Sequence, residues 1–290
     1  MNDKSLTALM CLFVKSYHYK NNKYWIYYDN LSYKLIGKDY DTVYENLRKG
    51  IEFFLPKNNL SDEDAVNKIV NSILAPSILG RSVFCDFHLR NEIKLGAKNY
   101  LIFASGYDMS AYLNRFKGLN VYEFDQEFMF KDKIKRLDKA LIEHNFINYV
   151  ACDLSKDNLQ ELNLKIEGKC FCSLLGISYY LSKNDFFNFI KNISLIVSVN
   201  STICFDYPTY DDSEESLKNN MLAEESGEKM LSKYSYEEIE KILSDCGFLI
   251  YEHVNYDEIT RQYFDKYNSL NPNNKITAKK GTSYVLALKK

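Results

Sequence analysis

The sequence has little of what marks several large classes of protein. Its seven cysteines form no CxxC pair and no cysteine–histidine spacing, so we expect reduced thiols and no metal site. No apolar run reaches membrane-spanning length, and the N-terminal apolar stretch is too short and mixed for a signal peptide. The net charge of −2 comes with no basic stripe, which argues against a nucleic-acid partner. These absences predict a cytoplasmic protein with neither a membrane nor a nucleic acid as partner.

What is present is the composition of an ordinary folded protein, with 46% hydrophobic and 26% charged residues. Residues 1–95 have the spacing of helices, and prolines or glycines follow several of the segments. No linker separates this region from the rest, so we expect 1–95 to form a helical cap on a core of 96–290, as one structural unit. The expected helices lie at about 6–17, 40–54, 62–73 and 81–95.

From residue 97 onward, short apolar runs alternate with helical segments, which is typical of a mostly parallel sheet with helices on both faces. The charged stretch 211–233 has weak periodicity and is predicted to be a lid, although charge runs of this kind often form plain solvated surface. The predicted strands lie at 100–104, 119–124, 148–152, 169–175, within 197–207, at 248–254 and at 283–288.

The prediction of a ligand-binding site rests mainly on the stretch 99–125. A buried strand ends at Ala104, the turn Ser105-Gly106 follows, and a short helix begins at Ser110. The next strand ends in acid, and of its two carboxylates we favour Asp125 over Glu123 as the ribose ligand. Strand, glycine turn, helix and acid-ended strand is the arrangement that binds a nucleotide-like ligand.

Polar or glycine residues also follow the other predicted parallel strands. Ligands of such sheets bind beyond the carboxyl ends of the strands, so the topology gathers these residues along one edge. The turn is neither GxGxxG nor a P-loop, and Asp108 near the helix start would repel a pyrophosphate. A ligand with a cationic amino-acid end, such as S-adenosylmethionine, suits it better. The residues at this edge are Asp108, Asp125, Asp153, Gly176 and Asp206.

Longer motifs point the same way. The turn segment FASGYDMSAY (103–112) resembles the LGAGLDTRAY signature of the leucine carboxyl methyltransferase family, which includes O-methyltransferases linked to polyketide biosynthesis. RSVFCDF (81–87) is similar to the family's R-T-x-x-F/I-D segment, and 176–181 to its EG-V-S-x-YL loop. The resemblance implies an α/β, Rossmann-like class I methyltransferase fold with strand order 3-2-1-4-5-7-6.

The resemblance also implies roles for individual residues. Arg81 would pair with the methionyl carboxylate of S-adenosylmethionine, and Asp108 would lie near its amino group. Asp125 would accept the ribose hydroxyls, while Asp153 and the Leu154 backbone would hold the adenine. Further cofactor contacts would come from Ala104, Ser105, Gly106 and Leu175, and substrate contacts from Tyr179, Tyr180 and Asp206.

Purely structural interpretations of several of these residues stay open. Arg81 could pair with Asp86 or Glu92 on a helix surface. Asp153 and Asp206 could be helix N-caps, and the two tyrosines could simply pack.

Three residues depart from the family pattern. Ala104 replaces the first glycine of the turn and is tolerable there if its φ stays below zero. Leu113 replaces an arginine, and Leu175 replaces an acidic residue that would face the cofactor or the substrate. These departures leave a second hypothesis open, a catalytically impaired binding or scaffolding protein with the same fold.

The function that we predict is S-adenosylmethionine-dependent O-methylation of a carboxylate or hydroxyl on a small molecule or peptide. Such a displacement depends mainly on proximity and orientation, and a carboxylate acceptor needs no general base. The sequence identifies no catalytic residue, no acceptor and no oligomeric state. An NAD-dependent enzyme is a third, less favoured hypothesis.

Overall fold

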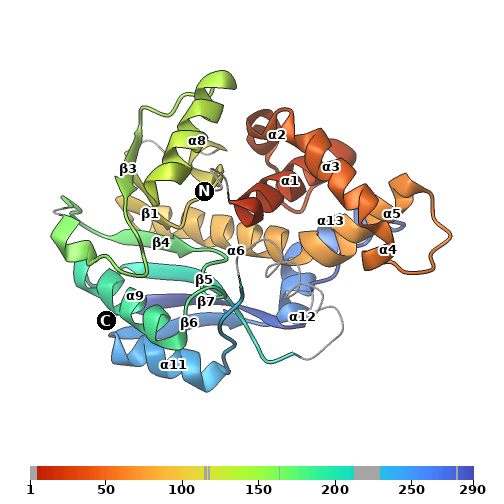
Figure 1. Ribbon diagram of the computed structural model, residues 1–290. Helices are drawn as coiled ribbons and strands as arrows, with labels where there is room; N and C mark the ends of the chain where they lie inside the picture. Colours follow the sequence, from red (N-terminus) through yellow and green to blue (C-terminus); the bar gives the residue numbers. More distant parts are fainter. Residues whose placement is uncertain (1–4, 114–115, 117, 163, 212–228, 279) are drawn as a thin grey trace.

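The computed structural model describes residues 5–113, 116, 118–162, 164–211, 229–278 and 280–290. A seven-stranded sheet with the order β3-β2-β1-β4-β5-β7-β6 forms its centre (Figure 1). β7 runs antiparallel to both of its neighbours, β5 and β6, whereas the other four strand pairings described in this sheet are parallel. The fold class and strand order predicted from the sequence are therefore confirmed. The strands are β1 (Asn99–Phe103), β2 (Asn120–Asp125), β3 (Ile147–Ala151), β4 (Cys170–Leu174), β5 (Thr202–Pro208), β6 (Phe248–Val254) and β7 (Thr282–Lys289).

Side chains at alternate positions along the strands pack into two separate hydrophobic cores. Tyr100 and Ile102 of β1 join the core that contains the N-terminal helices. Leu101 and Phe103 point to the other face, where α9 (Lys183–Ile196) and α11 (Tyr236–Asp245) cover the sheet. Both faces of β1 are thus buried, as expected for a central parallel strand.

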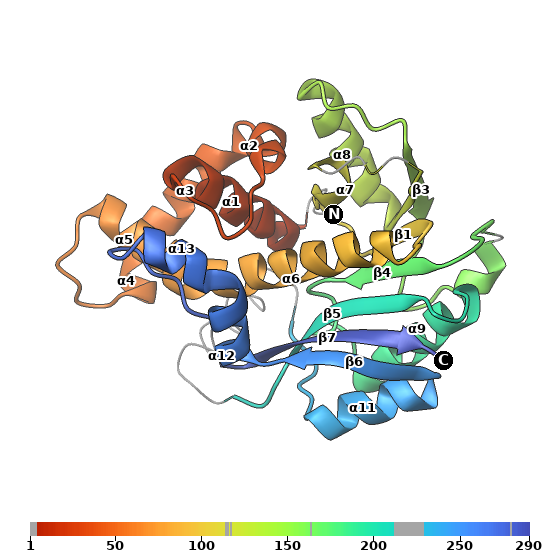
Figure 2. The same ribbon diagram turned by 180° about the vertical axis from the view of Figure 1, so that it is seen from behind.

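The first 95 residues form two kinds of structure. A group of short helices makes a layer away from the sheet, while α6 lies along the sheet itself (Figures 1 and 2). Gly80 lets α6 approach β7 closely, since a Cβ there would stand 2.6 Å from the Tyr284 hydroxyl. The helices are α1 (Leu6–Asn21), α2 (Asn30–Ile36), α3 (Asp39–Lys49), α4 (Ile51–Phe54), α5 (Asp62–Ile69), the π-helix η1 (Val70–Leu74) and α6 (Ala75–Lys94).

Two predicted helix boundaries in this region are wrong. The expected helix 40–54 is divided at Gly50 into α3 and α4. The expected stop before Pro76 is instead a continuous run of α5, η1 and α6. Pro76 lies in the first turn of α6, where its missing N–H costs little.

The helical layer also receives a segment from the other end of the chain, which the sequence analysis did not predict. Residues 256–270 form α12 (Tyr256–Ile259), the π-helix η3 (Thr260–Phe264) and α13 (Asp265–Leu270). The Tyr267 hydroxyl donates to Asn22 at 2.7 Å, and its ring lies 5.3 Å from that of His18. The layer is therefore built from both ends of the sequence.

The remaining helices follow the predicted alternation. They are α7 (Ser110–Leu113), α8 (Glu127–Lys139), the 3₁₀ turn η2 (Leu159–Leu162), α9 and α11. The described part of the helix expected at 110–116 ends at Leu113. Most of the predicted lid, residues 212–228, lies outside the described residues. Among the described residues, no helix is both long and apolar enough to span a bilayer.

The turn after β1 contains a backbone conformation that favours glycine. Ala104 has a φ of +50°, so the condition under which alanine would be tolerated here, a φ below zero, is not met. Left-handed conformation costs an L-residue about 1–2 kcal/mol. The family turn has glycine here, and alanine holds the same conformation at a cost.

We predict that Ala104→Gly stabilises the protein by about 0.5–1 kcal/mol, because relief of the left-handed strain exceeds the extra chain entropy of glycine. Denaturant unfolding measures the change. Ala140 is the matched control, since its φ of −82° is ordinary. Ala140→Gly should destabilise, and a loss of stability in Ala104→Gly would contradict the strain at the turn.

Candidate active site

A cavity of about 2050 Å³ opens at the carboxyl ends of β1 and β4. The turn after β1, the end of β2, the loop after β4 and the helices α1 and α6 all contribute to its lining. Of the five residues expected at this edge, Asp108, Asp125 and Gly176 line the cavity, whereas Asp153 and Asp206 do not. The predicted site residues that line the cavity are Arg81, Ala104, Ser105, Gly106, Asp108, Asp125, Leu175, Tyr179 and Tyr180.

Asp125 joins the end of β2 to the turn after β1. Its Oδ2 accepts a hydrogen bond from the Gly106 N–H at 2.7 Å, and its Oδ1 accepts from the Gln126 N–H at 2.7 Å. Because each carboxylate oxygen can accept more than one hydrogen bond, holding the turn is compatible with accepting a hydroxyl from the cavity. The side chain lines the cavity, which is the position that a ribose ligand requires.

Glu123, the other acid of β2, is buried in a different network. Lys133 of α8 donates to its Oε2 at 2.7 Å, and both side chains are fully buried. Burial raises the pKa of the Glu123 carboxyl, and Lys133 opposes this by lowering it. Lys133 also donates to the Asp108 carbonyl at 2.9 Å. Glu123 thus holds α8 and the turn together, which leaves Asp125 as the acid of β2 that faces the cavity.

Asp108 is paired with a residue of the first helix. Lys15 of α1, only 7% exposed, lies 2.8 Å from the Asp108 Oδ1, and Ser110 donates to the other oxygen. Burial would raise the pKa of Asp108, but the charge and hydrogen bond of Lys15, the hydrogen bond from Ser110 and the charge of Lys133 together lower the pKa to about 2. Asp108 therefore stays ionised and fastens α1 over the turn.

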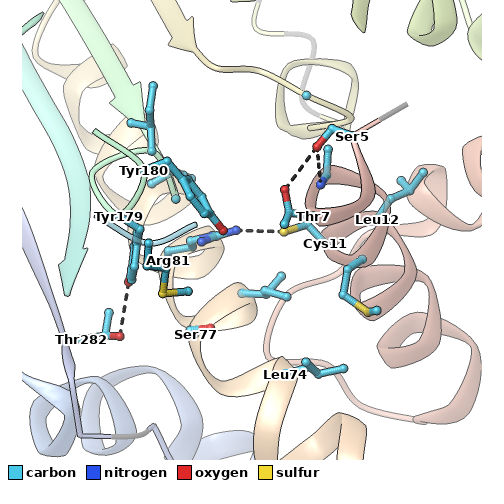
Figure 3. Close-up of a pocket in the computed structure, with 18 of the residues that line it drawn as sticks. Ser5, Thr7, Cys11, Leu12, Leu74, Ser77, Arg81, Tyr179, Tyr180 and Thr282 are labelled. Carbon is cyan, nitrogen blue, oxygen red and sulfur yellow. Dashed lines mark hydrogen bonds between the residues drawn. The ribbon is translucent and has the colours of Figure 1, made fainter. Parts of the chain in front are cut away.

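Arg81 projects from α6 into the cavity, as Figure 3 shows. One guanidinium nitrogen lies 3.4 Å from the Asp206 carboxylate, and another donates to the Cys11 sulfur at 3.0 Å. Burial disfavours the charge, yet Cys11 and Asp206 together raise the pKa of Arg81 above its usual value. Arg81 pairs with neither of the surface partners considered from the sequence, because Asp86 pairs with Arg90 and Glu92 with Lys169.

The loop after β4 allows Arg81 to lie where it does. Gly176 has a φ of +73°, and a Cβ at this position would stand 2.8 Å from the guanidinium carbon. Any side chain would therefore displace Arg81 as well as strain the loop. The glycine of this loop makes room for the cation.

Asp206 lies beneath the cavity and does not line it, which corrects the expectation of substrate contact. It is fully buried, and it accepts from the Gly176 N–H at 2.7 Å and from the Tyr179 hydroxyl at 3.1 Å. With the Arg81 contact, one carboxylate holds the helix, the loop and the tyrosine. It is not a helix cap. Figure 3 shows Tyr179 directed toward Thr282, while Tyr180 lies beside Arg81.

Asp153 and Leu154 are not brought to the cavity. The Asp153 side chain accepts from the N–H and hydroxyl of Ser155 and pairs with Lys156 at 2.8 Å. This is a local turn of the kind that aspartate commonly forms after a strand. No helix begins at Asp153, so the helix N-cap that the sequence left open is not formed there either.

Sequence reasoning missed the contributions of α1 and of the lysines around the cavity. Lys15 and Cys11 carry no local motif, and their partners lie 93 and 70 positions away. Four further lysines line the cavity without any spacing signal, namely Lys229, Lys233, Lys275 and Lys280. Among the described residues, no group of three or more histidine, cysteine or acidic side chains could hold a metal ion.

We predict that Lys15→Met destabilises the protein by about 3 kcal/mol near neutral pH, because it leaves Asp108 charged and buried without its partner. The depressed pKa of Asp108 contributes stability above its unfolded pKa of about 3.9, and this contribution is lost as the pH falls toward about 2. The difference from the parent should therefore shrink over that window. Urea unfolding at several pH values measures it.

The control for this variant is Lys156→Met. The Lys156–Asp153 pair has the same 2.8 Å separation, but the lysine side chain is 77% exposed. Exposed pairs contribute little, so this variant should unfold like the parent. Equal effects of the two substitutions would contradict a structural role for the buried pair.

Comparisons with known proteins agree with this geometry. Residues 8–194 match the model of the family described as leucine carboxyl methyltransferase. The chain is 31% identical, over all of its length and 99% of the relative, to YktD of Bacillus subtilis (strain 168), whose name assigns it provisionally to the S-adenosyl-L-methionine-dependent methyltransferases.

Two solved structures share the fold. One is a DUF574 family protein from Streptomyces avermitilis, with a TM-score of 0.62, 10% identity and coverage of 99% of this chain and 98% of that one. The other is a provisionally assigned methyltransferase from Thermobifida fusca, with a TM-score of 0.56, 17% identity and coverage of 84% and 94%. The family match and the relative together establish that this chain belongs to the leucine carboxyl methyltransferase family of S-adenosylmethionine-dependent methyltransferases.

Proposed function

We propose that the protein transfers a methyl group from S-adenosylmethionine to an oxygen of a small molecule or peptide, and that this oxygen belongs to a carboxylate. The observation that carries the proposal is the charge of the cavity. Six basic side chains line it against three acidic ones, and without the Lys15–Asp108 ion pair five basic side chains remain against two acidic ones. An anionic acceptor is attracted to such a cavity, whereas a neutral alcohol is not.

The described residues fit the cofactor at three points. Arg81 offers a buried cation for the methionyl carboxylate, and Asp125 offers acceptors for the ribose hydroxyls. Ser105 Oγ is buried and has no hydrogen-bond partner among the described residues, although it belongs to the turn that lines the cavity. A buried polar atom without a partner is costly unless a ligand satisfies it.

The cofactor would supply a methyl group activated on a sulfonium. The methyl carbon would leave the sulfur and bond to the acceptor oxygen, so the cavity must hold the two in line. A carboxylate acceptor is already deprotonated, whereas a hydroxyl benefits from a general base. None of the four histidines lines the cavity. This absence of an imidazole base supports a carboxylate acceptor.

The apolar part of the cavity supports an acceptor with a hydrophobic body. Much of the wall that the helical layer contributes consists of aliphatic and aromatic side chains, and the volume exceeds the roughly 300–1,000 Å³ of a usual ligand pocket. Cofactor and acceptor can therefore be held together. A polyketide-derived acid is one acceptor that fits this description. The apolar residues contributed by this layer are Leu6, Met10, Val43, Leu47, Phe53, Phe54, Ile73 and Leu74.

Two features favour the alternative of an impaired, cofactor-binding relative. Ala104 holds the turn in a strained conformation, and Leu175 presents an apolar side chain to the cavity where the family has an acid. Under this alternative the protein binds the cofactor and transfers no methyl group to any acceptor. The two experiments below separate the possibilities.

We predict that S-adenosylhomocysteine binds the protein in a calorimetric titration. Asp125→Ala should weaken the affinity by a factor of about 10–100, the effect of removing one hydrogen-bonded charged group. Arg81→Met should weaken it by a similar factor. Asp153→Ala is the control and should change the affinity less than about twofold, because its side chain lies outside the cavity. Absence of binding would overturn the cofactor assignment.

We further predict that methyl groups from tritiated S-adenosylmethionine are transferred to apolar monocarboxylates and released as volatile methanol by mild base. Carboxyl methyl esters hydrolyse under these conditions, whereas methyl ethers do not. Base-stable label on alcohols or phenols would contradict the carboxylate preference. Cofactor binding with no labelled product over a broad panel of acceptors would favour the impaired relative.

A further inference from the structure

A group of aromatic side chains lies on the outer surface of the helical layer, in α1, α2 and the segment between them. Four of these rings are exposed by between 37% (Trp25) and 50% (Tyr28). The group contains five rings, and none of them lines the cavity. We call this surface, together with the lysines described below, the aromatic–lysine face. Its rings are Tyr19, Tyr24, Trp25, Tyr28 and Tyr33.

Contacts between the rings make most of this face continuous. Trp25 stacks on Tyr19 with centroids 5.8 Å apart, and it forms a T-shaped contact with Tyr28 with centroids 5.0 Å apart. Tyr19 also contacts Tyr33 at 6.2 Å. The rings thus hold one another in place while one side of the group remains in contact with solvent.

Lysines surround these rings. Lys20, Lys23 and Lys34 are exposed, and the ammonium groups of the first two lie over tyrosine rings. The one acid between residues 19 and 38 is Asp29, which is fully buried and bonded to Ser32. All exposed charged side chains between residues 19 and 38 are therefore lysines, although the whole chain carries a net charge of −2.

We propose that the aromatic–lysine face docks the protein on an anionic lipid surface. Tryptophan and tyrosine favour the interface between water and lipid, because their rings are apolar and their tips polar. Each nearby lysine adds attraction to anionic headgroups. The sequence argument against a membrane partner rested on the absence of a spanning segment, and peripheral docking needs none.

A single-stranded nucleic acid is the competing partner for aromatic and basic surfaces. Base stacking needs an open ring face. Tyr19 covers one face of Trp25, and Tyr28 meets Tyr19 and Trp25 edge to face. The geometry therefore favours insertion of ring edges into a lipid interface over stacking of bases.

Trp25 is the only tryptophan of the chain, so its fluorescence reports on this face alone. The experiment adds vesicles of phosphatidylcholine, with or without phosphatidylglycerol, to the full-length protein. We expect Trp25 emission to move to shorter wavelength only with the anionic vesicles. We expect the protein to sediment with the same vesicles, and high salt to release it.

Matched variants test the charges. Replacing Lys20, Lys23 and Lys34 by glutamine should weaken vesicle binding on the order of 100-fold, at about fivefold for each lysine. The control replaces Lys131, Lys156 and Lys241, which are exposed elsewhere, and changes the net charge equally. It should change binding less than about threefold.

The ring contribution is tested by Tyr28→Ser against Tyr251→Ser. Tyr251 is 73% exposed and lies on β6, on the opposite side of the molecule from α2 (Figures 1 and 2). Only Tyr28→Ser should weaken vesicle binding. Circular dichroism and unchanged affinity for S-adenosylhomocysteine show that each variant is folded, provided that the parent binds this ligand.

Three results would overturn the proposal. The first is an unchanged Trp25 spectrum and no sedimentation of the parent protein with anionic vesicles. The second is equal loss of binding in the two triple-lysine variants, which would show attraction by total charge rather than by this face. The third is a Trp25 response to single-stranded DNA without one to vesicles, which would assign the face to nucleic acid.

Discussion

The buried ion pair between Lys15 and Asp108 fastens the first helix of the chain to the turn at the centre of the sheet. Neither charge could be buried alone, because desolvation of an unpaired ion costs several kcal/mol. The pair spans 93 positions of sequence and closes the cavity on the side of α1. The contact of Cys11 with Arg81 also depends on α1 lying there.

A second buried carboxylate organises the opposite wall. Asp206 holds Arg81, the Gly176 backbone and the Tyr179 hydroxyl from below. The guanidinium is thereby held at the cavity surface with its charge retained. The close approach of α6 to β7 at Gly80 fixes the distance of Arg81 from the sheet. The site thus lies between two helices, each fixed to the sheet by an ion pair. A cofactor bound between them would meet groups that are already oriented.

Part of this arrangement follows from local sequence. The apolar runs predict the strands, and the glycine turn with Asp125 predicts the ligand edge, because strand ends converge whatever the loops do. The sequence shows that Ala104 departs from the family pattern, but the residue type does not reveal its positive φ. The helix break at Gly50 and the continuous helical run through Pro76 depend on tertiary packing, which local helix propensity does not reflect.

Other residues have roles that only the assembled chain can reveal. Asp153 and Asp206 both follow or end a strand, yet one forms a solvent-facing turn and the other is sealed beneath α6. Burial of Asp206 depends on β7 and on Arg81, from distant parts of the chain. Lys15 and α13 gave no signal for the same reason, since their partners are distant and no periodicity marks a long-range contact.

We propose that the cavity beneath α1 holds S-adenosylmethionine between Arg81 and Asp125. A crystal structure of the protein with S-adenosylhomocysteine tests it most directly. We expect the ribose hydroxyls within hydrogen-bonding distance of the Asp125 carboxylate and the amino-acid carboxylate against the Arg81 guanidinium. A ligand bound outside this cavity, or one with its ribose directed away from Asp125, would contradict it.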